Sequence, residues 1–245
     1  VAVEANLAAF AAGRSEAVAP GAGPTHTAGP EITVPDLPAP LASRADALGE
    51  AVVLRAADLL GYQNAAYVER YLHLVERVAA VGDDALTEAV AVSHHHLLAY
   101  KDEYEVARLL TGPEAQATIT AVGGAGAKAA WKLHPPTLKA LGMNRKIAIP
   151  TTVGSPIMKM LARGRRLRGT ALDPFGRTEM RRLERELITV FESSIDTVLG
   201  RIADGSMTVD EAARIAALPQ TVRGFEERKI ERAVAYRAEL TTALG

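Results

Sequence analysis

The chain of 245 residues contains no cysteine. This absence excludes disulfide bonds, zinc held by thiolates and cysteine-ligated iron–sulfur clusters within the chain. The sequence also lacks any apolar run near the roughly 20 residues of a membrane span, and its first four residues (VAVE) lack the basic and apolar regions of a signal peptide. We therefore expect a cytoplasmic protein that does not contact membranes.

The chain also lacks an excess of charge of either sign. The chain has 28 Lys and Arg against 29 Asp and Glu, a formal charge of -1. This balance gives no overall bias toward nucleic acid, and we expect no nucleic-acid partner. Apolar residues make up 48 % of the sequence, enough for one sizeable core. The first residue is Val rather than Met, which indicates a piece of a longer polypeptide.

Composition divides the chain into three parts. Residues 2–13 are rich in Ala and predict a short helix that packs on a neighbour outside the chain. Residues 17–40 are rich in Pro, Gly and Ala, a composition typical of a linker. Residues 41–245 carry helical periodicity and predict a separate helical domain.

The fold class predicted for this domain is mainly α, a multi-helix globular domain. Val68, Leu72, Val75 and Ala79 recur at helical spacing, and a second helix is predicted from Ala85 to about Leu110 with a break near Tyr100. An apolar stripe predicts a long helix from about residue 177 to Gly200. The stretch 208–211 (TVDE) matches a capping box before a short helix, and a last helix is predicted over 221–240. Near 112–156, repeated Gly and Pro predict an irregular or β-hairpin insert, with a short strand or a hairpin around 146–152.

Three consecutive histidines, His94 to His96, suggest a metal site. Adjacent helical residues point about 100° apart, so the three cannot converge on one ion. Buried or interfacial histidines are the better interpretation, and we expect no metal, cofactor or catalytic site in the chain.

A dense polar cluster follows at 100–109 (YKDEYEVARL). One interpretation is an ion-pair network that fixes helix packing. The alternative is an independent enzyme in which Lys101, Asp102 and Glu103 act together as acid and base.

A basic stretch runs from Lys132 to Arg182. It holds twelve Lys and Arg and only two acidic residues, Asp173 and Glu179, for a net charge of +10. Such a stretch can attract an acidic partner, or its arginines can lie on several faces and pair internally. The candidate interface residues are Tyr100, Lys101, Asp102, Glu103, Arg108, Arg163, Arg165, Arg166, Arg168, Asp173 and Arg223.

Five stretches together resemble the C-terminal domain of the indolepyruvate ferredoxin oxidoreductase family. They are 55–67 (RAADLLGYQNAAY), 99–109 (AYKDEYEVARL), 132–136 (KLHPP), 167–176 (LRGTALDPFG) and 218–225 (LPQTVRGF). Residues 1–16 resemble the end of the gamma-like oxidoreductase domain that precedes this region in the family.

The resemblance implies a parent enzyme that decarboxylates a 2-oxoacid with thiamine diphosphate and Mg²⁺ and passes electrons through iron–sulfur clusters to ferredoxin. The thiamine motif and the cluster cysteines are absent from this chain. The resemblance therefore implies an accessory or assembly segment. Its expected partners are the catalytic domains of the same polypeptide, a second copy in a homo-oligomer and, as an alternative, acidic ferredoxin docking on Arg163, Arg165, Arg166 and Arg168.

Overall fold

The computed structural model describes residues 3–18, 34–124, 126–133, 147–224 and 227–245. The chain divides into two compact units, residues 1–33 and 34–245. In the first unit, helix α1 (Val3–Val18) runs five residues beyond the predicted end at Gly13. An internal Gly costs a helix only about 1 kcal/mol, which the good helix formers around it can offset.

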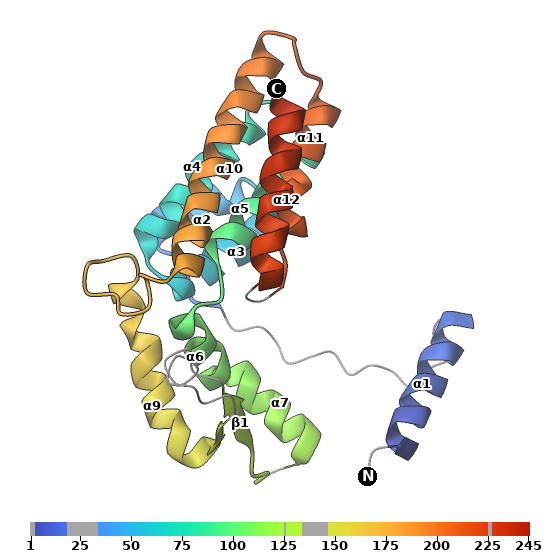
Figure 1. Cartoon of the computed structure of the whole chain (residues 1–245), viewed down its shortest axis with the longest axis vertical. Coiled ribbons are helices and arrows are strands. Elements are labelled where there is room, and N and C mark those ends of the chain that lie inside the picture. The colour runs from blue at the N-terminus through green and yellow to red at the C-terminus, as the bar shows by residue number, and fades with distance from the viewer. Residues whose placement is uncertain (1–2, 19–33, 125, 134–146, 225–226) are drawn as a thin grey trace. The chain divides into compact units, whose positions relative to one another are not determined.

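The second unit is built on a helical bundle (Figure 1). Its first helices are α2 (Ala39–Asp46), α3 (Glu50–Tyr62), α4 (Ala65–Ala79) and α5 (Asp84–Leu98). The chain returns to the bundle with α10 (Glu179–Ala203), α11 (Val209–Ala217) and α12 (Glu227–Leu244). One apolar core joins these helices, with Leu72, Val90 and Ile195 among its fully buried side chains.

Side chains cap the helices where the bundle turns. Asn64 accepts a hydrogen bond from the Tyr67 amide at the start of α4, and Asp83 does the same for Leu86 at the start of α5. The predicted capping box is present at α11, where Thr208 and Glu211 satisfy each other's backbone N–H groups.

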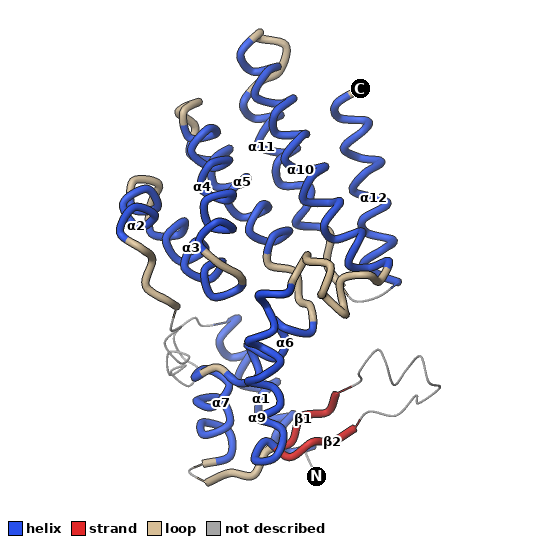
Figure 2. The backbone as a smooth tube through the Cα atoms, turned by 90° about the vertical axis from the view of Figure 1, so that its left-hand side faces the viewer, coloured by secondary structure: helices blue, strands red, loops and turns tan. Residues whose placement is uncertain are grey.

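Between α5 and α10 the chain forms an insert at one end of the bundle (Figure 2). Its described elements are α6 (Glu103–Thr111), α7 (Pro113–Gly123), strands β1 (Ala130–Leu133) and β2 (Ile147–Pro150), α9 (Thr151–Arg163) and the 3-10 turn η1 (Gly164–Leu167). The strands pair antiparallel, with Ala130 opposite Pro150 and Leu133 opposite Ile147.

The prediction of a mainly α fold with a small hairpin is confirmed. The stretch 112–156 is more helical than predicted, since it contains α7 and the start of α9. Pro113 occupies the first turn of α7, where its missing N–H costs nothing, and Gly124 ends that helix with a φ of +80°. The break near Tyr100 lies between α5 and α6, as predicted.

The last helix begins at Glu227 rather than Thr221, because the 3-10 turn η2 (Leu218–Thr221) occupies the predicted first turn. The part of the predicted insert at 134–146 lies outside the described residues. Among the helices that are described, none combines the length and apolarity needed to cross a membrane.

Candidate functional site

A buried arginine lies where the insert meets the bundle. The Arg168 side chain is 3 % exposed, and its Nε and Nη2 donate to Asp102 Oδ2 and Oδ1 at 2.5 and 2.8 Å. Its Nη1 donates to the Tyr62 carbonyl at 2.6 Å, and its Cζ lies 3.6 Å from the centre of the Tyr62 ring. The guanidinium therefore has a carboxylate, a carbonyl and an aromatic face as partners, which compensate the cost of burying it.

Asp102 also forms the N-cap of α6. Its Oδ1 accepts the Glu105 amide hydrogen at 2.8 Å. One carboxylate thus connects the start of α6, the segment after η1 and, through Arg168, the end of α3. Burial alone would lower the pKa of Arg168, but its hydrogen bonds to Asp102 raise that pKa above the ordinary value, so the guanidinium stays charged.

A second carboxylate, Asp173, is held by backbone amides. The N–H groups of Gly169 and Phe175 donate to it at 3.0 and 3.1 Å, and the Tyr104 hydroxyl donates at 3.1 Å. Burial alone would raise the pKa of Asp173, but these hydrogen bonds hold it below its usual range. We call Tyr62, Asp102, Tyr104, Arg168 and Asp173 the junction.

The glycines beside the junction permit its close packing. A Cβ at Gly164 would lie 2.7 Å from Tyr104 Cε1, and one at Gly176 would lie 2.5 Å from Asp173 Oδ2. Neither position can take a side chain without movement of the junction.

Ion pairs surround the junction on two sides. Arg108 binds Glu105 through two hydrogen bonds and reaches Asp58 at 2.6 Å, and Asp58 also contacts His95. On the other side, Arg181 pairs with Glu103 and Glu184, and Lys229 from α12 also pairs with Glu184. Each of these charges has an oppositely charged partner beside it. The ion pairs connect α6 to α3 on one side, and to α10 and through it to α12 on the other.

The predicted polar cluster is divided by this geometry. Asp102 and Glu103 lie in separate ion pairs, with Arg168 and Arg181, and Lys101 is exposed. Tyr100 is buried, and its carbonyl accepts the Tyr62 hydroxyl at 3.1 Å. The convergent acid and base geometry that an enzyme would require is not formed by these three side chains.

The four candidate arginines of the basic stretch also separate into two kinds. Arg168 is buried in the junction, and Arg165 donates to the Gly61 carbonyl. Arg163 and Arg166 are exposed. Arg223 is exposed, and its Nε donates to the nearby Gln220 carbonyl at 2.8 Å.

The three histidines point to three different partners. Their Nε2 atoms lie 3.0 Å from Glu192, Asp58 and the Val222 carbonyl respectively. Within the described ranges no three His, Cys, Asp or Glu side chains are placed to hold a metal. Sequence reasoning missed Glu192, because only the fold brings α10 beside α5.

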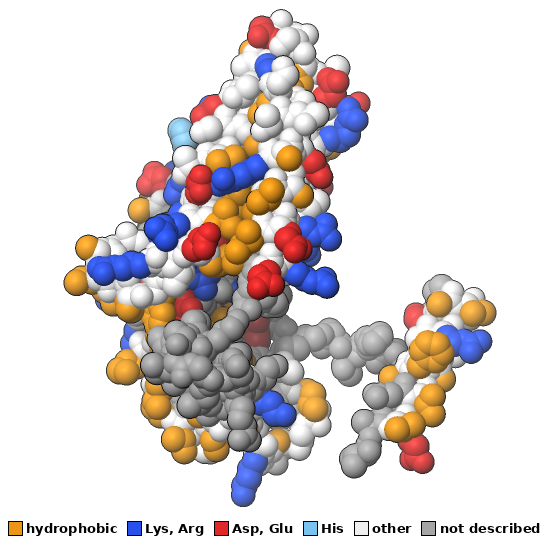
Figure 3. All heavy atoms as spheres, in the orientation of Figure 1, with side chains coloured by type: hydrophobic (Ala, Val, Ile, Leu, Met, Phe, Trp, Pro, Cys, Tyr) orange, Lys and Arg blue, Asp and Glu red, His pale blue; other side chains and the backbone are white. Residues whose placement is uncertain are grey.

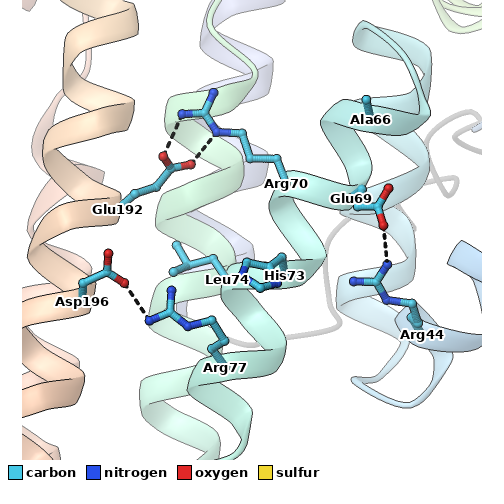
Figure 4. A pocket seen from close by; sticks show the side chains of 9 residues that line it. All are labelled: Arg44, Ala66, Glu69, Arg70, His73, Leu74, Arg77, Glu192 and Asp196. Atoms are coloured by element: carbon cyan, nitrogen blue, oxygen red, sulfur yellow. Dashed lines mark hydrogen bonds and ion pairs between the residues drawn. The ribbon is translucent and has the colours of Figure 1, made fainter.

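A groove of about 460 Å³ lies between α4, α10 and α2 (Figure 4). Its charged walls are internally paired: Arg70 binds Glu192 through two hydrogen bonds, and Arg77 contacts Asp196 at 2.7 Å. Arg44 reaches Glu69 at 3.3 Å across the same groove. No cluster of unpaired polar groups suited to catalysis is apparent in its described lining.

A family model described as a family of unknown function, DUF6537, matches residues 48–242. The chain belongs to this family. The match includes every residue of the junction. Comparison with curated proteins gave no match, and neither did comparison with solved structures.

Proposed function

We propose that this chain is an accessory and assembly domain of a thiamine-dependent 2-oxoacid:ferredoxin oxidoreductase of the indolepyruvate type. In this role it helps to build the enzyme and performs no chemistry of its own. The parent enzyme is cytoplasmic in this proposal, and the domain contacts the catalytic domains of the same polypeptide and takes part in a homo-oligomer.

The observation that supports this proposal is the position of the stretches that carry the resemblance. Tyr62, Asp102 with Tyr104, and Arg168 with Asp173 come from three of these stretches, and all five residues meet in the junction. A fourth stretch contributes the Val222 carbonyl, which His96 contacts at 3.0 Å. The residues that carry the resemblance thus hold the insert against the bundle.

The chemistry of these residues also favours an architectural role. Catalytic acids and bases need a free proton position beside a substrate cavity. Both junction carboxylates instead accept hydrogen bonds from fixed internal donors. Because the chain has no cysteine, it does not fit cysteine-ligated iron–sulfur clusters, so the proposal places the clusters, thiamine diphosphate and Mg²⁺ in the rest of the parent polypeptide.

The first test is the intact mass and the reading frame of the native product that contains this segment. We expect one long polypeptide with cluster cysteines and a thiamine-binding motif upstream. A native product that consists of these 245 residues alone would overturn the proposal.

The second test asks whether the domain acts in assembly. Arg168→Met in the parent enzyme should reduce the yield of assembled enzyme while the fraction that does assemble keeps its turnover per bound thiamine diphosphate. A normal yield with lower turnover would instead assign the junction a part in the chemistry. Arg182→Met, at an exposed arginine on α10, is the matched control.

A further inference from the structure

The outer side of α9 carries an apolar stripe that is exposed in the part of the domain that the structure describes. Val153, Ile157 and Met160 are 63 %, 58 % and 68 % exposed. Their spacing of four and three residues places them in one row along the helix. In Figure 3, hydrophobic side chains are visible over the region that α9 occupies at the lower left.

The helix cannot turn this stripe inward, because its other side is fixed. Gly154 lies against the hairpin, where an added Cβ would come within 2.8 Å of Ile149 and 3.0 Å of Trp131. Immediately after α9, Gly164 lies against the Tyr104 ring of α6. The exposed stripe is therefore a stable property of the folded insert.

Cations without partners lie beside the stripe. Lys159 and Arg163, four residues apart, form a row along α9, and Arg166 follows in η1. All three are exposed, and none makes an ion pair or side-chain hydrogen bond with any residue in the described ranges. This distinguishes them from Arg165 and Arg168, which bind inside the domain.

Among the residues that the structure describes, no acidic group pairs with the three cations of this surface. The sequence contains no Asp or Glu between Glu114 and Asp173. The carboxylates of α6, the helix that packs against α9, already pair with Arg108 and Arg181. The pKa of Arg165 is lowered, first by burial and then by the neighbouring arginines, which agrees with a positive potential around η1.

From this surface we infer that the outer face of α9 docks an acidic protein partner, whose contact segment carries apolar side chains flanked by Asp or Glu. Apolar contact supplies the burial, and complementary charge supplies orientation and rate of encounter. Met160 suits such a surface, because methionine adapts its shape to a partner. The inference goes beyond the proposed function, since it depends on α9 and not on the identity of the parent enzyme.

An anionic membrane is the competing occupant, and the stripe fits it less well. Helices that lie in a membrane surface usually insert Trp, Phe or Leu on a wide apolar face. The exposed row on α9 consists of Val, Ile and Met, and the helix is fixed against α6 and the hairpin. A protein surface of matching shape and opposite charge is the better complement.

Photo-crosslinking in the native full-length product tests the inference. The photoreactive residue benzoylphenylalanine replaces Ile157, and the crosslinked peptides are mapped by mass spectrometry. We expect a peptide in which apolar residues are flanked by Asp or Glu, and its crosslink should decrease about tenfold or more in the Lys159→Glu, Arg163→Glu, Arg166→Glu variant. Crosslinks no stronger than those from Val122, also exposed but on α7, would overturn the inference.

Two controls keep the result interpretable. The matched control is the triple variant Arg182→Glu, Arg228→Glu, Arg232→Glu, at exposed arginines of α10 and α12. It changes the net charge by the same amount as the α9 reversal and should leave the crosslink intact. If the α9 reversal variant does not fold by circular dichroism, Ile157→Ser with Met160→Ser removes the stripe without changing charge, with the photoreactive residue moved to Val153. An undiminished crosslink in that variant contradicts the inference.

Membrane binding is measured separately, by sedimentation of the protein with vesicles of equimolar phosphatidylcholine and phosphatidylserine. We expect the protein to stay in the supernatant. Cosedimentation that the α9 reversal abolishes would replace the protein partner with an anionic bilayer.

Discussion

The Arg168–Asp102 pair gives the sharpest test of the junction. Arg168→Met keeps much of the side-chain volume but leaves the Asp102 carboxylate, 3 % exposed, without its cation. Removal of one partner from a buried ion pair costs about 3–5 kcal/mol. Asp102→Asn should cost a similar amount, because it keeps the cap on α6 but leaves the Arg168 charge unpaired. Either change removes a large part of the ~5–15 kcal/mol that stabilises a typical domain.

The assay is urea unfolding followed by circular dichroism, with both single variants and the double variant Arg168→Met, Asp102→Asn. Because the double variant removes both charges of the pair and leaves neither one unpaired, its loss should be smaller than the sum of the single losses by about 1–3 kcal/mol. Arg166→Met is the control: an exposed arginine two residues away that should change stability by less than about 0.5 kcal/mol. If Arg168→Met is as mild as the control, or if the two single losses simply add, the buried pair does not hold the junction.

Three further measurements test other parts of the structure. Thermal unfolding of two glycine variants tests the packing beside the junction. Gly164→Ala should lower the free energy of unfolding by about 1–3 kcal/mol, because its Cβ would meet Tyr104. Gly200→Ala, in open space on α10, should raise the free energy of unfolding by about 0.5–1 kcal/mol. Burial alone would raise the pKa of Glu192, but hydrogen bonds from His94 and Arg70 lower it from 4.5 to about 2. Reduced for a side chain that is 25 % exposed, this shift contributes about 2–3 kcal/mol, which is complete above pH 4.5 and is lost as pH falls toward 2. Acid unfolding of Glu192→Gln should therefore lack that component, and an unchanged pH profile would contradict the assignment. Thr208→Ala should cost about 1 kcal/mol in chemical unfolding by removing the cap of α11.

The sequence predicted the helices well wherever capping and periodicity agreed. The apolar stripe that includes Leu187, Phe191 and Ile195 is indeed the buried face of α10, and the box at Thr208 begins α11. It failed where Gly and Pro mark helix ends rather than loops, as at Pro113 and Gly124. Local signals of this kind identify a boundary without stating on which side of it the helix lies.

The junction shows a different limit of sequence reasoning. Asp102, Arg168 and Asp173 were candidates from charge density and resemblance, but Tyr62 was not a candidate although its ring and carbonyl both contact Arg168. Asp102 and Arg168 are 66 positions apart, so no local pattern could pair them. The same limit applies to His94 and Glu192, which meet across 98 positions.

Buried polar groups of this kind can specify an arrangement without adding net stability. Because a carboxylate only accepts, the Nε2 of His94 donates to Glu192, and its buried Nδ1 has no partner among the described residues. Burial lowers the pKa of His94, so the domain keeps it uncharged below the pH at which an unfolded chain would protonate it.

At the junction, amide hydrogen exchange of the double variant Arg168→Met, Asp102→Asn tests whether the buried pair specifies the orientation of α6. If the pair fixes orientation, α6 should exchange faster than in the unmodified protein even where the global free energy of unfolding is largely recovered, while α4, which lies outside the junction, should exchange at its usual rate. Equal protection of α6 in both proteins would mean that apolar packing alone positions the insert.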